Sequence, residues 1–284
     1  MELEFVKMHG LGNDFIIMDD RQGRIQEYAE YSVLAKKLCS RHFGIGADGI
    51  ILILESPDNH DIKFRIFNSD GSQPQMCGNG MRCFAKYLYE NKIVSKTKIR
   101  VDTKAGTIIP EVIVNDDGVV QSIRVDMGEP VLLCRDIPFK SKNRTTEKEN
   151  ITANGVEYSI TAVGMGNPHC VLFVDDITKV EPEKLGPFIE NHEKFPEKTN
   201  VELIEVVNSK ELIMKVWERG AGITLACGTG ACASLVAANL AGKTGQQAIV
   251  HLDGGDLEIN WDKTTNHIFK TGPAIEVFQG MVMI

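Results

Sequence analysis

A cysteine–glycine pattern of eight residues occurs twice in this chain. It reads MCGNGMRC at residues 76–83 and ACGTGACA at residues 226–233, so Cys77 and Cys227 each precede a Gly-x-Gly turn. An apolar, helix-like run follows each copy. A repeat with a period near 150 residues indicates two similar domains, because each copy then belongs to one structural unit. The two cysteines are therefore expected at equivalent positions, one in each domain.

The repeat extends upstream of the cysteines. Residues 67–68 (Phe-Asn) lie as far before Cys77 as residues 217–218 (Trp-Glu) lie before Cys227, and both pairs end short apolar stretches. If the two domains face each other, two thiols face each other across a cleft. Such an arrangement suits removing a proton from one side of a carbon atom while adding one to the other side.

The composition limits the classes of partner. The chain has 284 residues, enough for two domains with separate cores, and 43% of them are hydrophobic. Its formal net charge of −8, without a basic block, argues against nucleic acid or an anionic membrane as partner. No apolar run reaches the ~18–20 residues of a membrane span. The first residues, MELEFVK, lack the pattern of a secretory signal, so we expect a cytoplasmic protein.

The seven cysteines do not form a recognisable disulfide or metal pattern. Their odd number, without a secretion signal, argues against a disulfide framework. No Cys-x-x-Cys occurs, so the usual zinc and thioredoxin-like spacings are absent and no metal site is predicted. Cys83 and Cys232, inside the helix-like runs, are expected to be packing residues.

Short strand-like runs rich in Val, Ile, Phe and Thr dominate both halves, with Gly, Asn and Asp between them. Each half also has two helix-like runs, which gives an α+β fold. The predicted helices lie near 26–39, 80–91, 181–191 and 230–241.

The domain boundary is expected at Gly128-Glu129-Pro130, which gives domains 1–127 and 128–273. The last residues, 274–284, lie beyond the second repeat and are expected to return and complete the first domain. The polar stretch 140–150 is expected to be a solvated insertion.

Cys77 and Cys227 are the first candidates for chemistry. A cysteine at a helix N-terminus meets unpaired backbone N–H groups and the positive end of the helix dipole, which favour a thiolate. The glycines after each cysteine let a substrate approach the backbone, whose N–H groups can hold a carboxylate. The alternative is that both are small buried residues at a helix start, a common place for unpaired cysteine. Two repeat-equivalent copies favour the functional interpretation.

Gly-x-Gly-Asn also occurs twice, ending at Asn13 and at Asn167. An asparagine in a glycine turn offers a donor and an acceptor to a polar ligand, although it can also simply stabilise the turn. His169 follows the second copy. It could be a general base, could tune a nearby thiol, or could be a hydrogen-bonded structural histidine.

Glu218 and Arg219 precede the second cysteine, and Glu218 matches Asn68 in the repeat. An adjacent acid and base can address an ammonium and a carboxylate, respectively. The alternative is a surface ion pair of about 0–1 kcal/mol. The segment 44–49 fits GxGxxG, but a helix-like run precedes it and a strand follows, so a dinucleotide site is rejected.

The chain resembles the diaminopimelate epimerase family. The resemblance covers nearly its whole length and rests on KMHGLGNDF, RHFGIGADG, FNSDGS, MCGNGMRC, GMGNPHCV, TNVE, WERGAG and ACGTGACA. It implies two pseudo-symmetric domains, each a curled, mostly antiparallel sheet around a central helix, with the active site between them. It implies no cofactor, neither pyridoxal phosphate nor metal.

The resemblance also implies roles for individual residues. Cys77 and Cys227 look like the acid/base pair, and His169 and Glu218 match residues that tune them. The substrate-binding set matches Asn13, Asn68, Asn167, Asn200, Glu218 and Arg219, with Gly78-Asn79 and Gly228-Thr229 gripping the carboxylate at the reacting carbon. Gly49 is a departure, because some members carry a glutamine there that contacts substrate.

The sequence therefore predicts an isomerase that interconverts LL- and meso-2,6-diaminopimelate, in lysine and peptidoglycan precursor synthesis. It leaves a homodimer open. The alternatives are a related racemase, such as proline racemase, and a non-catalytic amino-acid-binding protein. The residues that disfavour the racemase suit a substrate with a second amino-acid head: Asn13, Asn68, Asn200 and Arg219.

Overall fold

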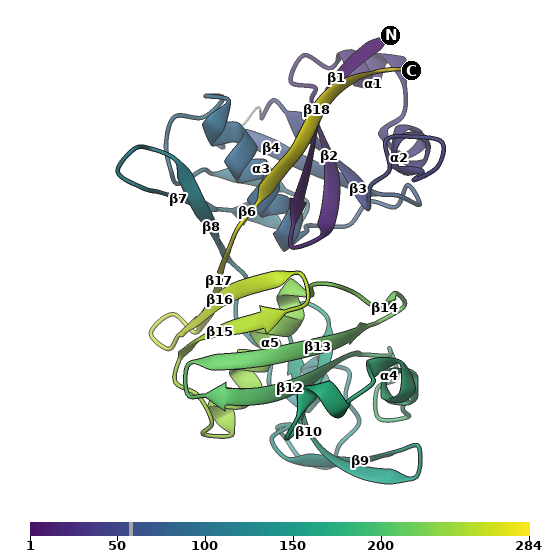
Figure 1. The fold of residues 1–284 in the computed structure, drawn as a ribbon, viewed down its shortest axis with the longest axis vertical. Coiled ribbons are helices and arrows are strands. Elements are labelled where there is room, and N and C mark those ends of the chain that lie inside the picture. Colours follow the sequence, from purple (N-terminus) through teal and green to yellow (C-terminus); the bar gives the residue numbers. More distant parts are fainter. Residues whose placement is uncertain (57–58) are drawn as a thin grey trace. The chain divides into compact units, whose positions relative to one another are not determined.

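The computed structural model describes residues 1–56 and 59–284. The chain folds as two compact units (Figure 1). Unit 1 contains Met1–Asp126 and Thr271–Ile284, and unit 2 contains Met127–Lys270.

Unit 1 is built on a sheet with the strand order β18-β1-β2-β3-β4-β5-β6. Two neighbouring pairs, β2–β3 and β4–β5, are parallel, and the other pairs are antiparallel. The antiparallel pair β7 (Glu111–Val114) and β8 (Val120–Asp126) follows β6 in the chain and does not belong to this sheet. The strands of the sheet are β1 (Glu2–Gly10), β2 (Asn13–Asp19), β3 (Gly49–Leu54), β4 (Ile62–Asn68), β5 (Val101–Thr103), β6 (Gly106–Ile108) and β18 (Ile275–Met283).

Helices pack on both faces of this sheet. The alternation of side chains along β3 places Ile50 and Leu52 in one core with α2 (Tyr31–Cys39). Ile51 points the other way, toward the start of α3 (Gly78–Glu90), where a Cβ on Gly80 would lie 3.0 Å from its Cδ1. Most of α3 is buried, and in Figure 1 it lies among the strands of its unit.

The single helix expected near 26–39 is wrong. The structure has two helices there, α1 (Arg24–Tyr28) and α2. Ala29 and Glu30 between them both have extended backbone, with ψ of 147° and 129°. The N–H of Ala29 still bonds to Ile25 O, so α1 ends as a closed turn before the chain starts α2.

Unit 2 repeats the arrangement with the strand order β17-β16-β15-β13-β12-β11-β10-β9, and β14 pairs with β13. The pairs β11–β12 and β13–β15 are parallel. The strands are β9 (Glu149–Ala153), β10 (Val156–Gly164), β11 (Pro168–Phe173), β12 (Asn200–Asn208), β13 (Glu211–Glu218), β14 (Gly222–Ile223), β15 (Gln247–Leu252), β16 (Gly255–Asp262) and β17 (His267–Gly272).

The helices of unit 2 also take separate faces of the sheet. Ile189 of α4 (Pro182–Glu190) shares a core with Val201 and Leu203 of β12. Glu202, between them in sequence, points toward the start of α5 (Gly228–Leu240). Small and apolar residues, mainly alanine, valine and leucine, make up most of α5, and most of the helix is buried.

The two units share one strand pattern, in which antiparallel and parallel pairs alternate in the same order. This confirms the expected α+β fold of two pseudo-symmetric, mostly antiparallel units, each with a largely buried helix after its cysteine. The registers of the parallel pairs define equivalent positions: Phe15 pairs with Gly49 where His169 pairs with Asn200, and Ile17 pairs with Ile51 where Val171 pairs with Glu202.

The polar stretch 140–150 is more ordered than expected. Thr146 and Glu149 are buried, and Glu149 accepts hydrogen bonds from Asn143 and Lys194 at 2.6 and 3.0 Å. Glu149 is also the first residue of β9. The end of the stretch that was expected to be solvated therefore belongs to a strand and contains a buried carboxylate. None of the helices in the described part of the chain is both long and apolar enough to span a bilayer.

Candidate active site

Cys77 forms the N-cap of α3. Its backbone is extended, with φ of −137° and ψ of 116°, and its Sγ accepts a hydrogen bond from Gly80 N–H at 3.5 Å. A capping side chain satisfies one of the N–H groups that a helix start leaves unpaired. The helix dipole places partial positive charge at the same point. Cys77 is half-buried.

Side-chain amides surround this thiol. Asn13, at the start of β2, has its Oδ1 3.8 Å from Cys77 Sγ and accepts from Asn79 Nδ2 at 3.3 Å. Asn13 Nδ2 in turn donates to Asp48 Oδ2 at 2.7 Å. Buried Arg82 donates to Asn79 Oδ1 at 2.9 Å. The amides of Asn13 and Asn79 are therefore held in a fixed orientation beside the sulfur.

Asn68 ends β4, and its side chain donates to Ser72 Oγ at 3.0 Å. Its register partner on β3 is Gly49. A Cβ on Gly49 would lie 2.6 Å from the carbonyl oxygen of Phe67, so the backbone leaves no room for a side chain there. The glutamine that some relatives are expected to carry could not replace Gly49 without a shift of the neighbouring strand.

Cys227 forms the N-cap of α5 in the same way. Its Sγ accepts from Gly230 N–H at 3.3 Å and lies 3.5 Å from Thr229 Oγ1. Unlike Cys77 it is buried. Glu218, at the end of β13, is fixed by Thr224, whose hydroxyl donates to its Oε1 at 2.6 Å.

His169 and Glu202 form a fully buried pair near Cys227. His169 Nδ1 lies 2.6 Å from Glu202 Oε1, and its Nε2 lies 2.9 Å from Asn167 Oδ1. The pair lies on adjacent parallel strands, β11 and β12, which fixes both side chains from the backbone. Glu202 is therefore a site neighbour that the sequence interpretation missed.

Asn200 and Arg219 are held together at the start of β12, where Asn200 is the register partner of His169 on β11. Asn200 Nδ2 donates to Pro168 O, and its Oδ1 accepts from the backbone N–H of Arg219, both at 2.9 Å. The guanidinium of Arg219 donates to Glu197 O at 3.0 Å. Arg219 is exposed, and its planar guanidinium has further N–H groups that a ligand could use.

The environment of Cys227 disfavours its charged form. Burial raises the pKa of this thiol well above its usual value, and the carboxylates of Glu218 and Glu202 add to the effect. Burial likewise raises the pKa of Glu218, and Glu202 contributes, while the Thr224 hydrogen bond opposes the shift. Burial and the two carboxylates together therefore favour the protonated form of Cys227.

The cysteines near Cys77 and Cys227 are buried and poorly suited to proton transfer. Burial raises the pKa of Cys83 to about 12, and that of Cys170 well above its usual value. Cys232 is fully buried in α5. This fits the prediction that Cys83 and Cys232 are packing residues, since a buried thiol is a poor nucleophile and a poor base.

His169, Glu202 and Cys227 offer three donor atoms within 4.8 Å of one another. Two tetrahedral zinc ligands at 2.0–2.1 Å from the ion would lie about 3.3 Å apart. The His169 and Glu202 atoms are only 2.6 Å apart and form a hydrogen bond. As they lie, these side chains bind each other and do not form a metal site.

The structure gathers the predicted site residues into two groups, each within one unit. In unit 1, Asn13 and Asn79 surround Cys77, while Asn68 is bonded to its own turn. The group in unit 2 consists of Asn167, His169, Asn200, Glu218, Arg219 and the turn Cys227-Gly228-Thr229. The supporting residues that the sequence interpretation missed are Asp48, Arg82, Glu202 and Thr224.

A signal for some of these missed residues was present. Glu202 is a charge within the apolar strand VELIEVV, and such a residue in a buried strand needs a partner. The roles of Arg82 and Thr224 have no comparable sequence signal.

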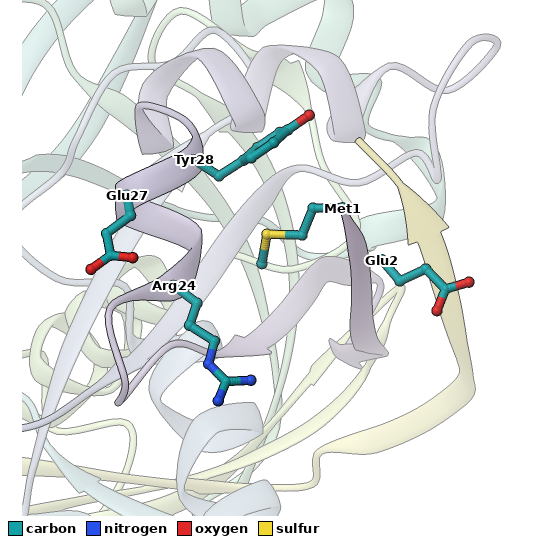
Figure 2. A pocket seen from close by; sticks show the side chains of 5 residues that line it. All are labelled: Met1, Glu2, Arg24, Glu27 and Tyr28. Carbon is teal, nitrogen blue, oxygen red and sulfur yellow. The ribbon is translucent and has the colours of Figure 1, made fainter.

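A pocket elsewhere on unit 1 shares no residue with this site. Figure 2 shows it at the N-terminal end of β1 beside α1, lined by Met1, Glu2, Arg24, Glu27 and Tyr28. Its lining combines two acids, one arginine and apolar surface, without the matched thiols and amides described above. It is therefore not the candidate active site.

Comparison with known proteins gives consistent matches. The family model described as diaminopimelate epimerase matches residues 5–133 and 161–277. A diaminopimelate epimerase of Desulforapulum autotrophicum is 59% identical over 284 residues, which cover 100% of both chains.

Two solved structures share the fold at low sequence identity. One is a Bacillus anthracis phenazine biosynthesis protein of the PhzF family, with a TM-score of 0.70, 18% identity and 100% coverage of both chains. The other is a hydroxyproline epimerase of Agrobacterium vitis, with a TM-score of 0.66 and 15% identity, covering 99% of this chain and 92% of that one.

Proposed function

This chain belongs to the diaminopimelate epimerase family, and we propose that it interconverts LL- and meso-2,6-diaminopimelate without a cofactor. It is accordingly an isomerase. In this proposal Cys77 and Cys227 are the two proton carriers, and the substrate binds with one thiol on each face of its α-carbon. The product would serve lysine and peptidoglycan precursor synthesis.

The observation that carries the proposal is the matched position of the two thiols. Each caps the helix that follows it and accepts a hydrogen bond from the N–H three residues later. In the reaction, one cysteine acts as thiolate and removes the α-proton, while the other acts as thiol and donates its proton to the opposite face. The S–H bond lost on one side is matched by one formed on the other, so the two cysteines exchange roles with the direction of reaction.

The backbone at the two helix starts supplies the electrostatic part of catalysis. Loss of the α-proton leaves negative charge that spreads onto the α-carboxylate. The N–H groups of Gly78-Asn79 and Gly228-Thr229 lie at the positive ends of the two helix dipoles, and we propose that they bind that carboxylate. Fixed donors of this kind typically contribute about 10²–10³ in rate each.

We assign recognition of the second amino-acid group of the substrate, the one distant from the reacting carbon, to further residues of the site. Arg219 is proposed to bind the distal carboxylate, with Asn200 holding its backbone. Glu218 is proposed to bind an ammonium group, and Asn13, Asn68 and Asn167 to supply neutral hydrogen bonds. His169 and Glu218 are proposed to tune the thiols.

The decisive experiment is deuterium exchange at the α-carbon. Purified protein with LL-diaminopimelate in D₂O, with a chelator and no added cofactor, should lose the α-proton signal in NMR and form the meso isomer. Binding without exchange would instead support a non-catalytic amino-acid-binding protein. Exchange of proline at a rate equal to that of diaminopimelate would support a general racemase.

A further inference from the structure

Two equivalent positions, one pair on each of two neighbouring strands, carry different kinds of residue near Cys77 and near Cys227. Glu202 on β12 occupies the register position that Ile51 occupies on β3, and His169 occupies that of Phe15. The helix after each cysteine confirms that Ile51 and Glu202 are equivalent, because a Cβ on Gly80 would meet Ile51 and a Cβ on Gly230 would meet Glu202. The Cys77 half therefore has two apolar residues where the Cys227 half has an acid and a histidine.

Glu202 is held in a demanding position. It is fully buried, its Oε1 bonds to His169, and its Oε2 has no hydrogen-bond partner within the described residues. A buried carboxylate oxygen without a partner destabilises the fold, because its lost hydration is not replaced. A simple structural role would be served better by the isoleucine of unit 1, so the carboxylate needs another explanation.

The carboxylate lies against the sulfur of the proposed proton carrier. A Cβ on Gly230 would lie 2.7 Å from Glu202 Oε1 and 3.1 Å from Cys227 Sγ, so one glycine separates the two groups. The other ionisable groups around Cys227 are Glu218 from β13 and His169 from β11, and Glu202 also faces the Cys170 thiol on β11. Both carboxylates oppose negative charge on Cys227.

His169 extends the influence of Glu202 to the substrate side. Its Nδ1 faces Glu202 and its Nε2 faces the side-chain amide of Asn167, which is one of the proposed substrate-binding residues. The protonation of the ring decides whether Asn167 turns its oxygen or its NH₂ group toward His169, and so which group remains for a ligand. Because Nδ1 faces the Glu202 carboxylate it carries a proton, so the end of the Asn167 amide that faces the ring depends on whether Nε2 carries a proton as well.

We propose that Glu202 is a positioning residue of the epimerisation, which keeps the proton on Cys227 in the free enzyme and orients Asn167 through His169. This inference rests on the proposed function. A two-thiol mechanism needs one thiol and one thiolate at the same time. Two cysteines in identical surroundings would titrate together, and only a narrow pH range would give the required state. Unequal surroundings widen that range, as they do for other acid/base pairs.

The test measures the Cys227 titration directly, without substrate. Thiolate absorbance near 240 nm is followed against pH for wild type and Glu202→Gln, and each is compared with the same protein carrying Cys227→Ser. Gln keeps the size of the side chain and an oxygen for His169 but removes the charge. We expect the Cys227 signal to move to lower pH by about one unit or more. Glu258→Gln, an equal loss of charge on an exposed part of β16, should leave it unmoved.

The same variants give a kinetic readout. For Glu202→Gln we expect the pH range of high kcat/KM for diaminopimelate to narrow and KM to rise, because Asn167 loses its fixed orientation. If this variant does not fold, the double variant His169→Phe and Glu202→Ile, which copies unit 1, takes its place with the same expected titration shift.

The outcomes separate the two proposals. An unmoved Cys227 titration, or a loss of stability with an unchanged pH profile, would overturn the role of Glu202. Absence of deuterium exchange in the wild-type protein, with a normal titration shift, would overturn the proposed function alone.

Discussion

Trp217 lies directly on Gly186, so that a Cβ added to that glycine would stand 2.6 Å from Trp217 Cδ2. The indole also donates to Glu190 Oε2 at 2.8 Å, and Glu190 Oε1 accepts from Gly220 N–H at 3.1 Å. Helix α4 thus clamps both ends of the segment that carries Glu218 and Arg219. The position of these two side chains depends on a contact that involves neither of them.

Gly186→Ala should therefore be damaging although alanine normally favours a helix. The added methyl group would force the Trp217 ring and the backbone of α4 to move. We expect this to lower the free energy of unfolding by about 1–3 kcal/mol, and to lower kcat/KM because Arg219 is displaced. Urea unfolding and steady-state kinetics measure the two effects. Gly245→Ala, where nothing lies within 4 Å of the added Cβ, is the matched control. Equal stability of the two variants would contradict the clamp.

Either alanine substitution at the proposed proton carriers, Cys77→Ala or Cys227→Ala, should lower kcat by about 10³-fold or more, because each face of the carbon needs its own proton carrier. Serine at either position should also be severely slowed, since a hydroxyl is a far weaker acid than a thiol. Circular dichroism should show the native fold in all four variants. Full activity in one alanine variant would refute the two-thiol mechanism.

Controls for that experiment come from the same helices. Cys83→Ala and Cys232→Ala remove thiols that are fully buried in α3 and α5. We expect each to lower the unfolding free energy by about 1–2 kcal/mol and to leave kcat within a few-fold of wild type. The contrast tests position, because the same chemical change is made a few residues further along the helix.

Arg219→Lys should separate charge from geometry. Lysine keeps the positive charge but loses the planar fork and the bond to Glu197 O. We expect kcat/KM on diaminopimelate to fall about 10–100-fold, with kcat falling as well, since binding of the distal head helps position the reacting carbon. Arg135→Lys, on an exposed side chain of the same unit, should have no effect. An Arg219→Lys variant as active as the Arg135 control would remove Arg219 from the substrate site.

Asp14 should make unit 1 sensitive to acid. Burial tends to raise its pKa, but hydrogen bonds from Arg41 and Lys7 outweigh this and lower the pKa to about 2. A lowered folded-state pKa contributes stability that is present above the ordinary value of 3.8 and is lost as the pH falls through about 2. The contribution at neutral pH is about 2 kcal/mol.

The measurement compares denaturant unfolding of wild type and Asp14→Asn at pH 6 and pH 3. The difference in unfolding free energy should shrink at the lower pH, because the wild-type carboxylate begins to be protonated in the unfolded chain. Asp116→Asn, at an exposed turn, should give the same small difference at both values. A difference for Asp14→Asn that does not change with pH would contradict the assignment of the shift to this carboxylate.

Much of the fold followed from apolar runs, and the exceptions have physical reasons. Strands such as β3 (GIILIL) and β13 (ELIMKVWE) can be predicted from their apolar composition. In contrast, β17 (HIFKTG) turns Ile268 and Lys270 inward, and β9 turns Glu149 inward with Ile151. A buried charge breaks the alternation on which strand prediction depends.

The residues of the candidate site also fall into some that the sequence predicts and some that it does not. Cys77, Cys227 and the asparagines of the glycine turns could be named because they repeat within the chain. Glu202 has no repeat partner, since unit 1 has Ile51 there, and its role depends on which strand neighbours which. Thr224 acts only through a hydrogen bond to Glu218, and such contacts need coordinates. An internal repeat identifies the site residues that the two units share, but not the residues in which they differ.

The pairing of β1 with β18 has a consequence for how the protein is made. Glu2 is opposite Met283, and the N-terminal amine bonds to Ile284 O at 3.0 Å. In Figure 1 the purple β1 and the yellow β18 lie side by side. Unit 2 is one continuous segment, whereas unit 1 needs Thr271–Ile284, which are synthesised after all of unit 2. During synthesis the unit that emerges first is therefore the one completed last. Until then the outer edge of β1 is an unpaired strand, so loss of a few C-terminal residues would leave the earliest part of the chain open to aggregation.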